Sequence, residues 1–425
     1  MEDLTLLSGR QWIVSQEDSS ILDGCSKIPV IENGSCNRCG TQVKSKLPNG
    51  KYYCRGCIGL GRANEGDWLV RKKSHGNNFD SVKDGGLTWQ GKLTPLQQNI
   101  SDKLVQNFEQ KKHTLVHAVT GAGKTEMLFQ LIAQCMKKGQ RACIATPRID
   151  VVNELFPRFS AAFAQLEIGK YHGREFKEAG MEQLTICTTH QLMKFYQAFD
   201  LLVIDEVDSF PYVGNPQLHF AAKNAVRADG VRMYLTATPT EDLLLEAKKG
   251  KLEILRLNRR FHGGLLPVPK EKLFIKPFLQ KKQIHPKLLQ EIRKVIQSGH
   301  PLLLFVPRIE EIPLYQEVLQ KKFKIKMAGV HAQDPQRLEK VQAFRECKYD
   351  LLLTTTILER GVTFKNVWVI IIAADDLIYT AASLVQIAGR VGRAKDDQTG
   401  LVLYCYHRYT KNIRQSIKQI KEMNQ

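Results

Sequence analysis

The sequence predicts an α/β protein with two parallel sheets in tandem, preceded by a small cysteine-rich module. Three observations support this fold class. From about residue 91 to the end, short apolar runs alternate with amphipathic stretches, a pattern typical of parallel sheets covered by helices on both faces. The alternation is interrupted once, near residues 258–264, so it forms two units. Two C-x-x-C pairs precede the first unit.

Each unit contains apolar runs that are expected to be buried strands. In the first unit these are residues 114–119, 141–146, 184–188, 201–205 and 233–236, with helices expected at 124–138 and 149–163. In the second unit the strands are expected at 302–306, 351–355, 367–373 and 401–406, and the helices at 286–299, 310–323 and 383–393. We therefore expect a tail (1–24), a cysteine module (25–62), a glycine- and asparagine-rich linker (63–90), a first lobe (91–258) and a second lobe (259–425).

Composition and charge narrow the class of protein. Of the 425 residues 43% are hydrophobic and 25% charged, which argues against a largely disordered chain. The longest apolar run, residues 367–374, has eight residues, whereas a membrane-spanning helix needs about 20. The acidic start lacks the features of a signal peptide. We expect a cytoplasmic protein that is not inserted directly in a membrane.

The formal net charge of +19 favours a polyanionic partner. Residues 248–294 contain 14 basic and 3 acidic side chains, a net +11. More than half of the excess charge therefore lies at the joint between the two units. This distribution places the expected phosphate contacts near the joint rather than in the cysteine module.

Residues 118–125 have the pattern of a phosphate-binding loop. They stand between an expected strand and an expected helix, which is the context that such a loop requires. Backbone N–H groups would close around the phosphates, Lys124 would reach the β/γ oxygens, and Thr125 would bind Mg²⁺. The predicted nucleotide site thus comprises Ala118, Val119, Thr120, Gly121, Ala122, Gly123, Lys124 and Thr125.

An acidic segment follows the apolar run 201–204. Asp205 and Glu206 would stand at the carboxyl end of a strand, the edge where open α/β sheets bind ligands. Asp205 would hold Mg²⁺, directly or through water. Glu206 would orient or deprotonate the attacking water.

From residue 91 to the end, the motifs resemble those of helicase superfamily two, the DEAD/DEAH-like translocases. The sequence Asp-Glu-Val-Asp at 205–208 stands at the position of the family's acidic box, and Q-I-A-G-R-V-G-R at 386–393 matches its Q-x-x-G-R-x-G-R motif. The resemblance implies two RecA-like lobes and ATP as the nucleotide. It also implies that ATP binding closes the lobes and that hydrolysis releases them.

The same resemblance implies roles for further residues. Gln97, in the sequence Leu-Thr-Pro-Leu-Gln, is the candidate reader of the adenine edge, with Trp89 close enough in sequence to stack on the base. Arg390 and Arg393 are implied arginine fingers that reach the γ-phosphate. Gly361 is implied to contact the nucleotide. Coupling between ATP and nucleic acid is implied for Thr236, Ala237, Thr238 and Gln386, and nucleic-acid contact for Arg148, Thr188, Thr189, His190, Thr354 and Thr355.

Cys36, Cys39, Cys54 and Cys57 have the spacing of a zinc ribbon. Four thiolates leave no open position on the metal, so a structural Zn²⁺ is expected. Cys25 lies nearby, and an exchange of this residue with Cys36 stays open. Basic and aromatic residues between the two pairs would either grip a single strand or form an ordinary solvated face.

A four-cysteine ribbon ahead of a two-lobe motor resembles the ComFA family of late competence proteins. The family is viewed as cytoplasmic ATPases that draw single-stranded DNA through the membrane channel during transformation. The resemblance implies single-stranded DNA and other competence proteins at the channel as partners, with recruitment to the inner face of the membrane by a partner. A homo-oligomer stays open.

Two alternatives remain. PriA-like replication-restart helicases share the motor motifs, but they are usually longer and carry their cysteines within the motor. A zinc-dependent DNA-binding scaffold with a silent motor fold is the alternative of another class. The complete set of motor residues argues against a silent motor.

Overall fold

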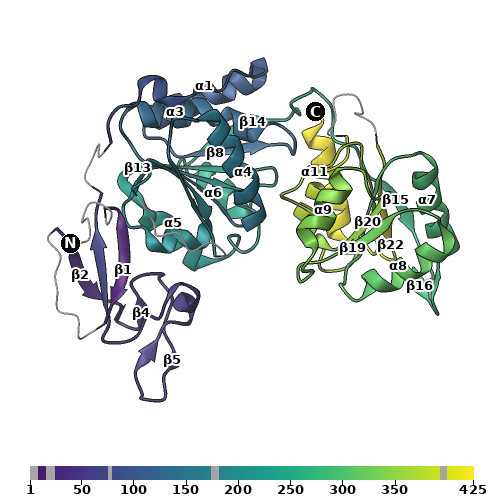
Figure 1. Ribbon diagram of the computed structural model, residues 1–425, viewed down its shortest axis with the longest axis horizontal. Helices are drawn as coiled ribbons and strands as arrows, with labels where there is room; N and C mark the ends of the chain where they lie inside the picture. Colours follow the sequence, from purple (N-terminus) through teal and green to yellow (C-terminus); the bar gives the residue numbers. More distant parts are fainter. Residues whose placement is uncertain (1–7, 16–23, 75–78, 174–180, 393–399) are drawn as a thin grey trace. The chain divides into compact units, whose positions relative to one another are not determined.

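The first lobe is a seven-stranded sheet in the computed structural model, which describes residues 8–15, 24–74, 79–173, 181–392 and 400–425 (Figure 1). The strand order is β10-β11-β9-β12-β13-β8-β14. The strands are β8 (Thr114–Ala118), β9 (Ala142–Thr146), β10 (Ile168–Tyr171), β11 (Leu184–Thr188), β12 (Phe199–Asp205), β13 (Val226–Thr236) and β14 (Glu253–Leu257). Leu201, Leu202, Val203 and Ile204 of β12 are all fully buried, as expected for a central parallel strand.

The second lobe is a six-stranded parallel sheet of order β15-β22-β21-β18-β20-β19. The strands are β15 (Lys270–Leu273), β18 (Leu302–Phe305), β19 (Met327–Val330), β20 (Leu351–Thr354), β21 (Trp368–Ile371) and β22 (Val402–Tyr406). A short hairpin, β16 (Leu279–Gln280) and β17 (Gln283–Ile284), precedes its first helix. The predicted fold class of two parallel-sheet lobes is confirmed.

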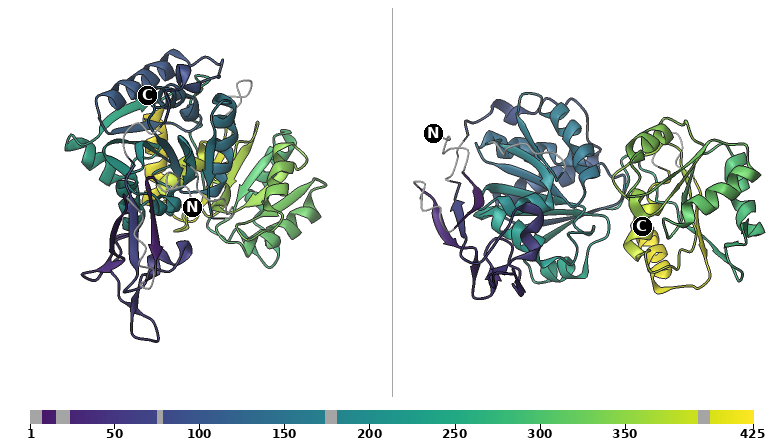
Figure 2. Two further views of the ribbon diagram at one scale, coloured as in Figure 1. Left: turned by 60° about the vertical axis from the view of Figure 1, so that its left-hand side comes forward. Right: turned by 60° about the horizontal axis from the view of Figure 1, so that its bottom comes forward.

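Helices cover both faces of each sheet (Figures 1 and 2). Lobe 1 has α1 (Pro95–Glu109), α2 (Lys124–Met127), α3 (Phe129–Lys137), α4 (Ile149–Ala162), α5 (Pro216–Ala225), α6 (Glu241–Lys248) and the 3₁₀ segment η4 (Thr189–Lys194). Lobe 2 has α7 (Pro286–Gln297), α8 (Glu311–Lys322), α9 (Arg337–Arg345), α10 (Ala381–Ala388) and α11 (Lys411–Met423). The helix expected at 124–138 is divided at Leu128 into α2 and α3.

Side-chain caps explain where many of these helices begin. Each capping oxygen accepts a hydrogen bond from a backbone N–H two or three residues later, which stabilises the helix start by about 1 kcal/mol. These caps are Thr94, Asn215, Thr240, Thr380 and Thr410. The described chain forms two compact units, residues 1–117 with 124–256 and residues 118–123 with 257–425.

The expected tail and linker are not merely connecting segments. The tail contributes β1 (Arg10–Val14), and the linker contributes β7 (Trp68–Lys72). Together with β2 (Ser26–Pro29) they form an antiparallel sheet of order β1-β7-β2. These strands have only four or five residues each, most of them half-buried, so none forms the long apolar run that predicts a buried strand.

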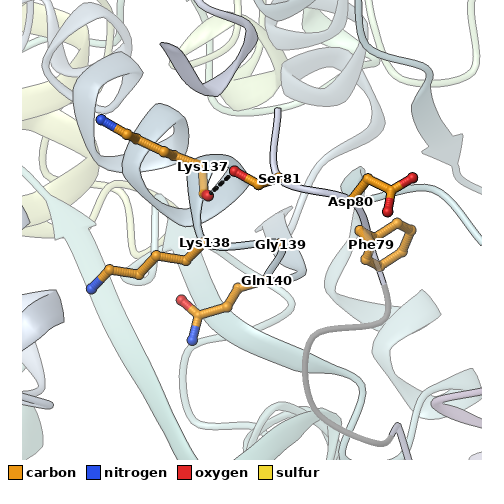
Figure 3. A pocket seen from close by; sticks show the side chains of 7 residues that line it. All are labelled: Phe79, Asp80, Ser81, Lys137, Lys138, Gly139 and Gln140. Atoms are coloured by element: carbon orange, nitrogen blue, oxygen red, sulfur yellow. Dashed lines mark hydrogen bonds between the residues drawn. The ribbon is translucent and has the colours of Figure 1, made fainter. Parts of the chain in front are cut away.

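The second half of the expected linker packs along lobe 1. The Ser81 hydroxyl donates to the carbonyl oxygen of Lys137 at 2.6 Å, on the edge of an open surface pocket at the end of α3 (Figure 3). Further on, the N–H of Thr88 donates to the Ala162 carbonyl at 2.8 Å. Residues 79–90 are therefore docked on the helices of lobe 1, and none of the residues that line this pocket was predicted to bind a ligand.

Candidate functional site

The phosphate loop leaves the carboxyl end of β8 and enters α2. Gly121 and Gly123 have φ angles of +80° and +72°, which residues with a Cβ rarely adopt. The Ala122 N–H donates to the Val119 carbonyl at 3.2 Å and closes the turn. Lys124 begins α2 and is half-buried. The predicted loop residues Ala118, Val119, Thr120, Ala122 and Thr125 are 0–7% exposed.

The acidic box stands at the carboxyl end of β12. Asp205 is the last residue of that strand, and its Oδ1 accepts a hydrogen bond from the Glu206 N–H at 2.9 Å. Glu206 has a φ of +53°, a conformation that is uncommon outside glycine and occurs often at functional sites. Only β13 separates β12 from β8 in the sheet. The acidic box and the phosphate loop therefore follow neighbouring parts of one sheet edge, where ligands of open α/β sheets bind.

Asp208 joins the acidic box to the Thr-Ala-Thr segment. Its Oδ1 accepts a hydrogen bond from Thr236 Oγ1 at 2.6 Å, and its Oδ2 accepts one from Thr238 Oγ1. The three side chains are 8%, 0% and 6% exposed, so the hydrogen bonds are shielded from water and correspondingly strong. The carbonyl of the buried Ala237 lies 3.2 Å from Nε2 of His117, whose pKa is lowered by burial.

Gln97 lies in the first turn of α1 and is only 2% exposed. Its Oε1 accepts hydrogen bonds from the Thr94 N–H at 2.9 Å and from Thr94 Oγ1 at 3.1 Å. These contacts form a capping box, which holds the amide in place; its contact with adenine stays a prediction. The Trp89 ring packs edge-on against Phe129 of α3, with centroids 5.4 Å apart.

The residues of lobe 1 that are predicted to contact nucleic acid differ in accessibility. His190 is exposed, and Arg148 is half-buried with its guanidinium 3.7 Å from the Asp150 carboxylate. By contrast, Thr188 and Thr189 are 5% and 0% exposed. Both threonines stand where β11 passes into η4, and their contact with nucleic acid stays a prediction.

In lobe 2 the arginine motif is held against the segment that follows β20. The Arg390 Nε–H donates to the Glu359 carbonyl at 3.1 Å, and the Ser383 hydroxyl donates to the Glu359 carboxylate. Gln386 is 5% exposed within α10, and Gly361 has a φ of +74°. Thr354 and Thr355 are 0% and 7% exposed. Arg393 lies outside the described residues.

Arg260, which no motif singles out, is a buried member of the basic joint. It is 3% exposed, and its guanidinium donates to the carbonyls of Gly389 at 3.2 Å and Val391 at 2.7 Å, and to that of Gly392. These carbonyls lie where α10 ends, so Arg260 caps the arginine motif. One positive charge of the joint therefore serves the fold and is not exposed to a polyanion.

The four predicted metal ligands come together. Their Sγ atoms all lie within 4.8 Å of one another, with 3.7 Å between Cys36 and Cys57 and 3.5 Å between Cys39 and Cys54. A tetrahedral Zn²⁺ with Zn–S bonds of about 2.3 Å would separate its thiolates by about 3.8 Å. All four side chains are at most 1% exposed. The cluster is thus compatible with zinc, and it excludes Cys25.

Arg38, between the first two cysteines, packs against the second pair. Its Nε–H donates to Cys57 Sγ at 3.2 Å, and its guanidinium donates to the carbonyls of Cys57 at 3.0 Å and Gly61 at 2.9 Å. A cation that hydrogen-bonds a thiolate stabilises the excess negative charge of a four-thiolate site.

Comparisons with known proteins agree with this architecture. Residues 90–241 match the family model of the type III restriction enzyme res subunit, and residues 284–395 match the helicase conserved C-terminal domain. The chain is 43% identical over 408 residues to competence protein ComFA of Streptococcus pneumoniae, covering 94% of this chain and 93% of that one. The chain belongs to the ComFA family. ComFA of Bacillus subtilis is 40% identical, with 92% and 85% of the two chains covered.

Membership of the ComFA family makes the chain a competence-associated, DNA-dependent ATPase of helicase type. Among solved structures, Mycobacterium smegmatis helicase Lhr bound to single-stranded DNA and AMP-PNP matches with a TM-score of 0.60 at 15% identity, over 78% of this chain and 50% of that one. This likeness supports the two-lobe fold. Within the described residues, no helix has the length and apolarity to cross a membrane.

Proposed function

We propose that the chain is an ATP-driven translocase on single-stranded DNA, which draws transforming DNA into the cytoplasm during natural competence. The observation that carries the proposal is the direct link from the acidic box to the coupling segment through Asp208. A motor needs such a link, because a change at the nucleotide must alter the grip on the nucleic acid.

In this proposal lobe 1 holds the nucleotide. Lys124 and the loop N–H groups bind the phosphates, and Gln97 contacts the adenine. Thr125 and Asp205 hold Mg²⁺, which neutralises charge on the phosphates when bound. Glu206 orients the attacking water and takes its proton. The half-buried position of the two carboxylates limits the access of bulk water to them.

Lobe 2 supplies the positive charge that the transition state requires. Arg390 and Arg393 serve as arginine fingers for the γ-phosphate, and Gly361 lies beside the nucleotide. The hydrogen bond from Arg390 Nε to Glu359 leaves the guanidinium pre-oriented, which reduces the cost of ordering it during the reaction.

Nucleic-acid contact is shared between backbone and side chains. Arg148 and His190 offer polar groups to the strand, whereas the buried Thr188, Thr189, Thr354 and Thr355 hold the backbone that grips it. Thr236, Ala237, Thr238 and Gln386 pass the state of the nucleotide to these segments. Zn²⁺ in the four-cysteine site is structural, because four thiolates complete its coordination.

Other competence proteins at the membrane DNA channel complete the proposed assembly. A partner recruits the chain to the inner face of the membrane, and a homo-oligomer is compatible with this arrangement. No further observation favours the replication-restart alternative.

The proposal is tested by ATP turnover with single-stranded DNA, forked duplex DNA, RNA and no nucleic acid. We expect single-stranded DNA to raise turnover most, and Lys124→Ala to abolish turnover while the thermal unfolding temperature stays unchanged. Lys103→Ala, an exposed lysine of α1, is the matched control. Stimulation by RNA alone would contradict the DNA assignment, a preference for forks would favour a PriA-like helicase, and no turnover at all would favour the scaffold.

A further inference from the structure

The cysteine module shares a hydrophobic core with lobe 1. Cys36, Cys39, Cys54 and Cys57 belong to the same buried cluster as Leu218 and Ala221 of α5 and Leu192 and Met193 of η4. A tethered zinc finger would have a core of its own. The module and lobe 1 therefore fold as one body, and they also fall in one compact unit.

The two metal-binding turns rest on α5. Gly40, which follows the first cysteine pair, has a φ of +74°, and a Cβ there would lie 2.8 Å from the Phe220 ring. In the second turn, a Cβ on Gly56 would lie 2.7 Å from the Gln217 side chain. Both turns thus pack closely against α5, where neither glycine leaves room for a larger residue without a shift.

Besides the contacts with α5, a second set of contacts connects the first turn to η4, through Arg71 of β7. The Arg71 guanidinium donates to the carbonyl of Asn37, between the first two cysteines, at 2.6 Å, and its Nε–H donates to Gln11 Oε1 at 3.0 Å. Gln11 Nε2 in turn donates to the carbonyl of Met193 at 2.9 Å. The same guanidinium lies 4.3 Å from the centre of the Tyr196 ring.

The contacts through α5 and those through Arg71 both lead to η4, whose first two residues are predicted to contact nucleic acid. The η4 segment begins with Thr189 and His190 and packs extensively against α5. The chain just after η4 is also tied to the residue just before β1, since the Tyr196 N–H donates to the Gly9 carbonyl at 3.0 Å. The position of η4 relative to β11 therefore depends on the cysteine module as well as on lobe 1.

We propose that Arg71 is a positioning residue, which, together with α5, transmits the geometry of the four-cysteine site to η4 and so sets the DNA grip of lobe 1. The four-cysteine site then holds η4 in place through Arg71 and α5, and we call this set of contacts the brace. In this proposal the cysteine module is not a separate DNA-binding finger. The part of this proposal that concerns DNA rests on the proposed function. The mechanical part, from the cysteines to η4, does not.

The mechanical part is tested by amide hydrogen exchange in the full chain. We expect residues 189–194 to exchange faster in Arg71→Ala, and also in the wild-type protein after zinc is removed by a chelator, because loss of the brace lets η4 open locally. Zinc content, measured by mass spectrometry, is expected to remain one per chain in Arg71→Ala. Unchanged exchange in η4 under both conditions would overturn the proposal.

The part of the proposal that concerns DNA is tested by comparing the DNA affinity of Arg71→Ala with that of the double variant Lys44→Ala and Lys46→Ala. The double variant removes cations of the cysteine module that lie outside the brace. Loss of a hydrogen bond to a charged group typically changes an equilibrium constant by about tenfold or more, so we expect Arg71→Ala to raise the half-saturating concentration of single-stranded DNA about tenfold. Its turnover without DNA is expected to stay close to that of the wild type, because Arg71 contacts Gln11, Asn37 and Tyr196, which lie outside the predicted nucleotide site. Arg71→Lys is expected to restore part of the affinity.

The outcomes separate the two proposals. A larger loss of affinity in the lysine double variant than in Arg71→Ala would make the ribbon a DNA-binding finger and overturn the brace. If single-stranded DNA failed to stimulate even the wild-type protein, the proposed function would fail, and the exchange measurement would still decide whether the brace exists.

Discussion

The two lobes hold their motifs with buried side chains of opposite charge. In lobe 1 the Asp208 carboxylate accepts hydrogen bonds from Thr236 and Thr238. In lobe 2 the Arg260 guanidinium donates to three carbonyls within residues 389–392. The carboxylate joins two segments that are far apart in the sequence, whereas the guanidinium holds a single turn. In the proposed motor, lobe 1 transmits a change and lobe 2 presents a fixed group.

The lobes also differ in what their cores contain. The core of lobe 1 extends into the cysteine module, while the main core cluster of lobe 2, described between Phe274 and Cys405, consists of its own strands and helices. A metal ion in the four-cysteine cluster would thus stabilise lobe 1 and not lobe 2. Variants in the two lobes should accordingly change different measured quantities.

The largest effect is expected from the group that lobe 2 presents. Arg390 is a proposed arginine finger, so Arg390→Ala should lower ATP turnover about 1,000-fold. Arg390→Lys should recover little of the rate, because an ammonium cannot reproduce the planar fork of a guanidinium. Arg408→Ala, an exposed arginine of the same lobe, is the control. Turnover of Arg390→Ala within tenfold of wild type would show that this residue is not a finger.

The next largest effect is expected on the stability of lobe 2, where Arg260 donates to the carbonyls of residues 389–392. Arg260→Met leaves buried carbonyls without donors, so the free energy of unfolding of lobe 2 should fall by about 3 kcal/mol. Calorimetry should then show its transition about 6–12 °C lower. Arg259→Met, a half-buried neighbour, should shift it far less. Equal shifts of the transition temperature for both variants would show that the buried hydrogen bonds of Arg260 do not stabilise lobe 2.

A smaller effect is expected from the transmitting group of lobe 1. Asp208→Asn replaces one acceptor oxygen by an NH₂ donor, so one threonine hydroxyl loses its present partner. The stimulation of turnover by single-stranded DNA should fall about tenfold, the equivalent of one hydrogen bond to a charged group. Asp242→Asn, in the first turn of α6, should leave stimulation intact. A loss of basal turnover alone would contradict the coupling role.

The smallest effect concerns the exposed charge at the joint. The double variant Lys248→Glu and Lys249→Glu should weaken single-stranded DNA binding several-fold and reduce the slope of log affinity against log salt by about 0.7 per lost phosphate contact. The same reversal at Lys44 and Lys46 should do less. A larger change from the second pair would move the phosphate contacts from the joint to the ribbon.

The strands that carry motifs could be predicted because their signals are local. The apolar run 201–205 predicts β12, which spans Phe199–Asp205, and an acidic end on such a run indicates the ligand edge. Edge strands gave no comparable signal. β14 and β15 contain charged residues, with the sequences EILRL and KEKL, because one side of an edge strand faces solvent.

The union of the module with lobe 1 could not be predicted from the sequence. Gln11 and Met193 are 182 positions apart, and Arg71 and Asn37 are 34 apart; such contacts depend on the folded topology. Arg260 is equally hidden, because it is one of 14 basic residues in the joint, and only its burial separates it from the solvated ones. Arg393 lies outside the described residues, so its role stays a prediction.

The central claim, movement along single-stranded DNA, is tested most directly by ATP turnover as a function of oligonucleotide length at saturating strand concentration. As the strand lengthens, a translocase spends a growing share of its time moving along the DNA before it dissociates from the end. We therefore predict that turnover rises with length to a plateau and that Lys124→Ala shows no turnover at any length. A rate that stays constant once the strand fills the binding site would contradict translocation.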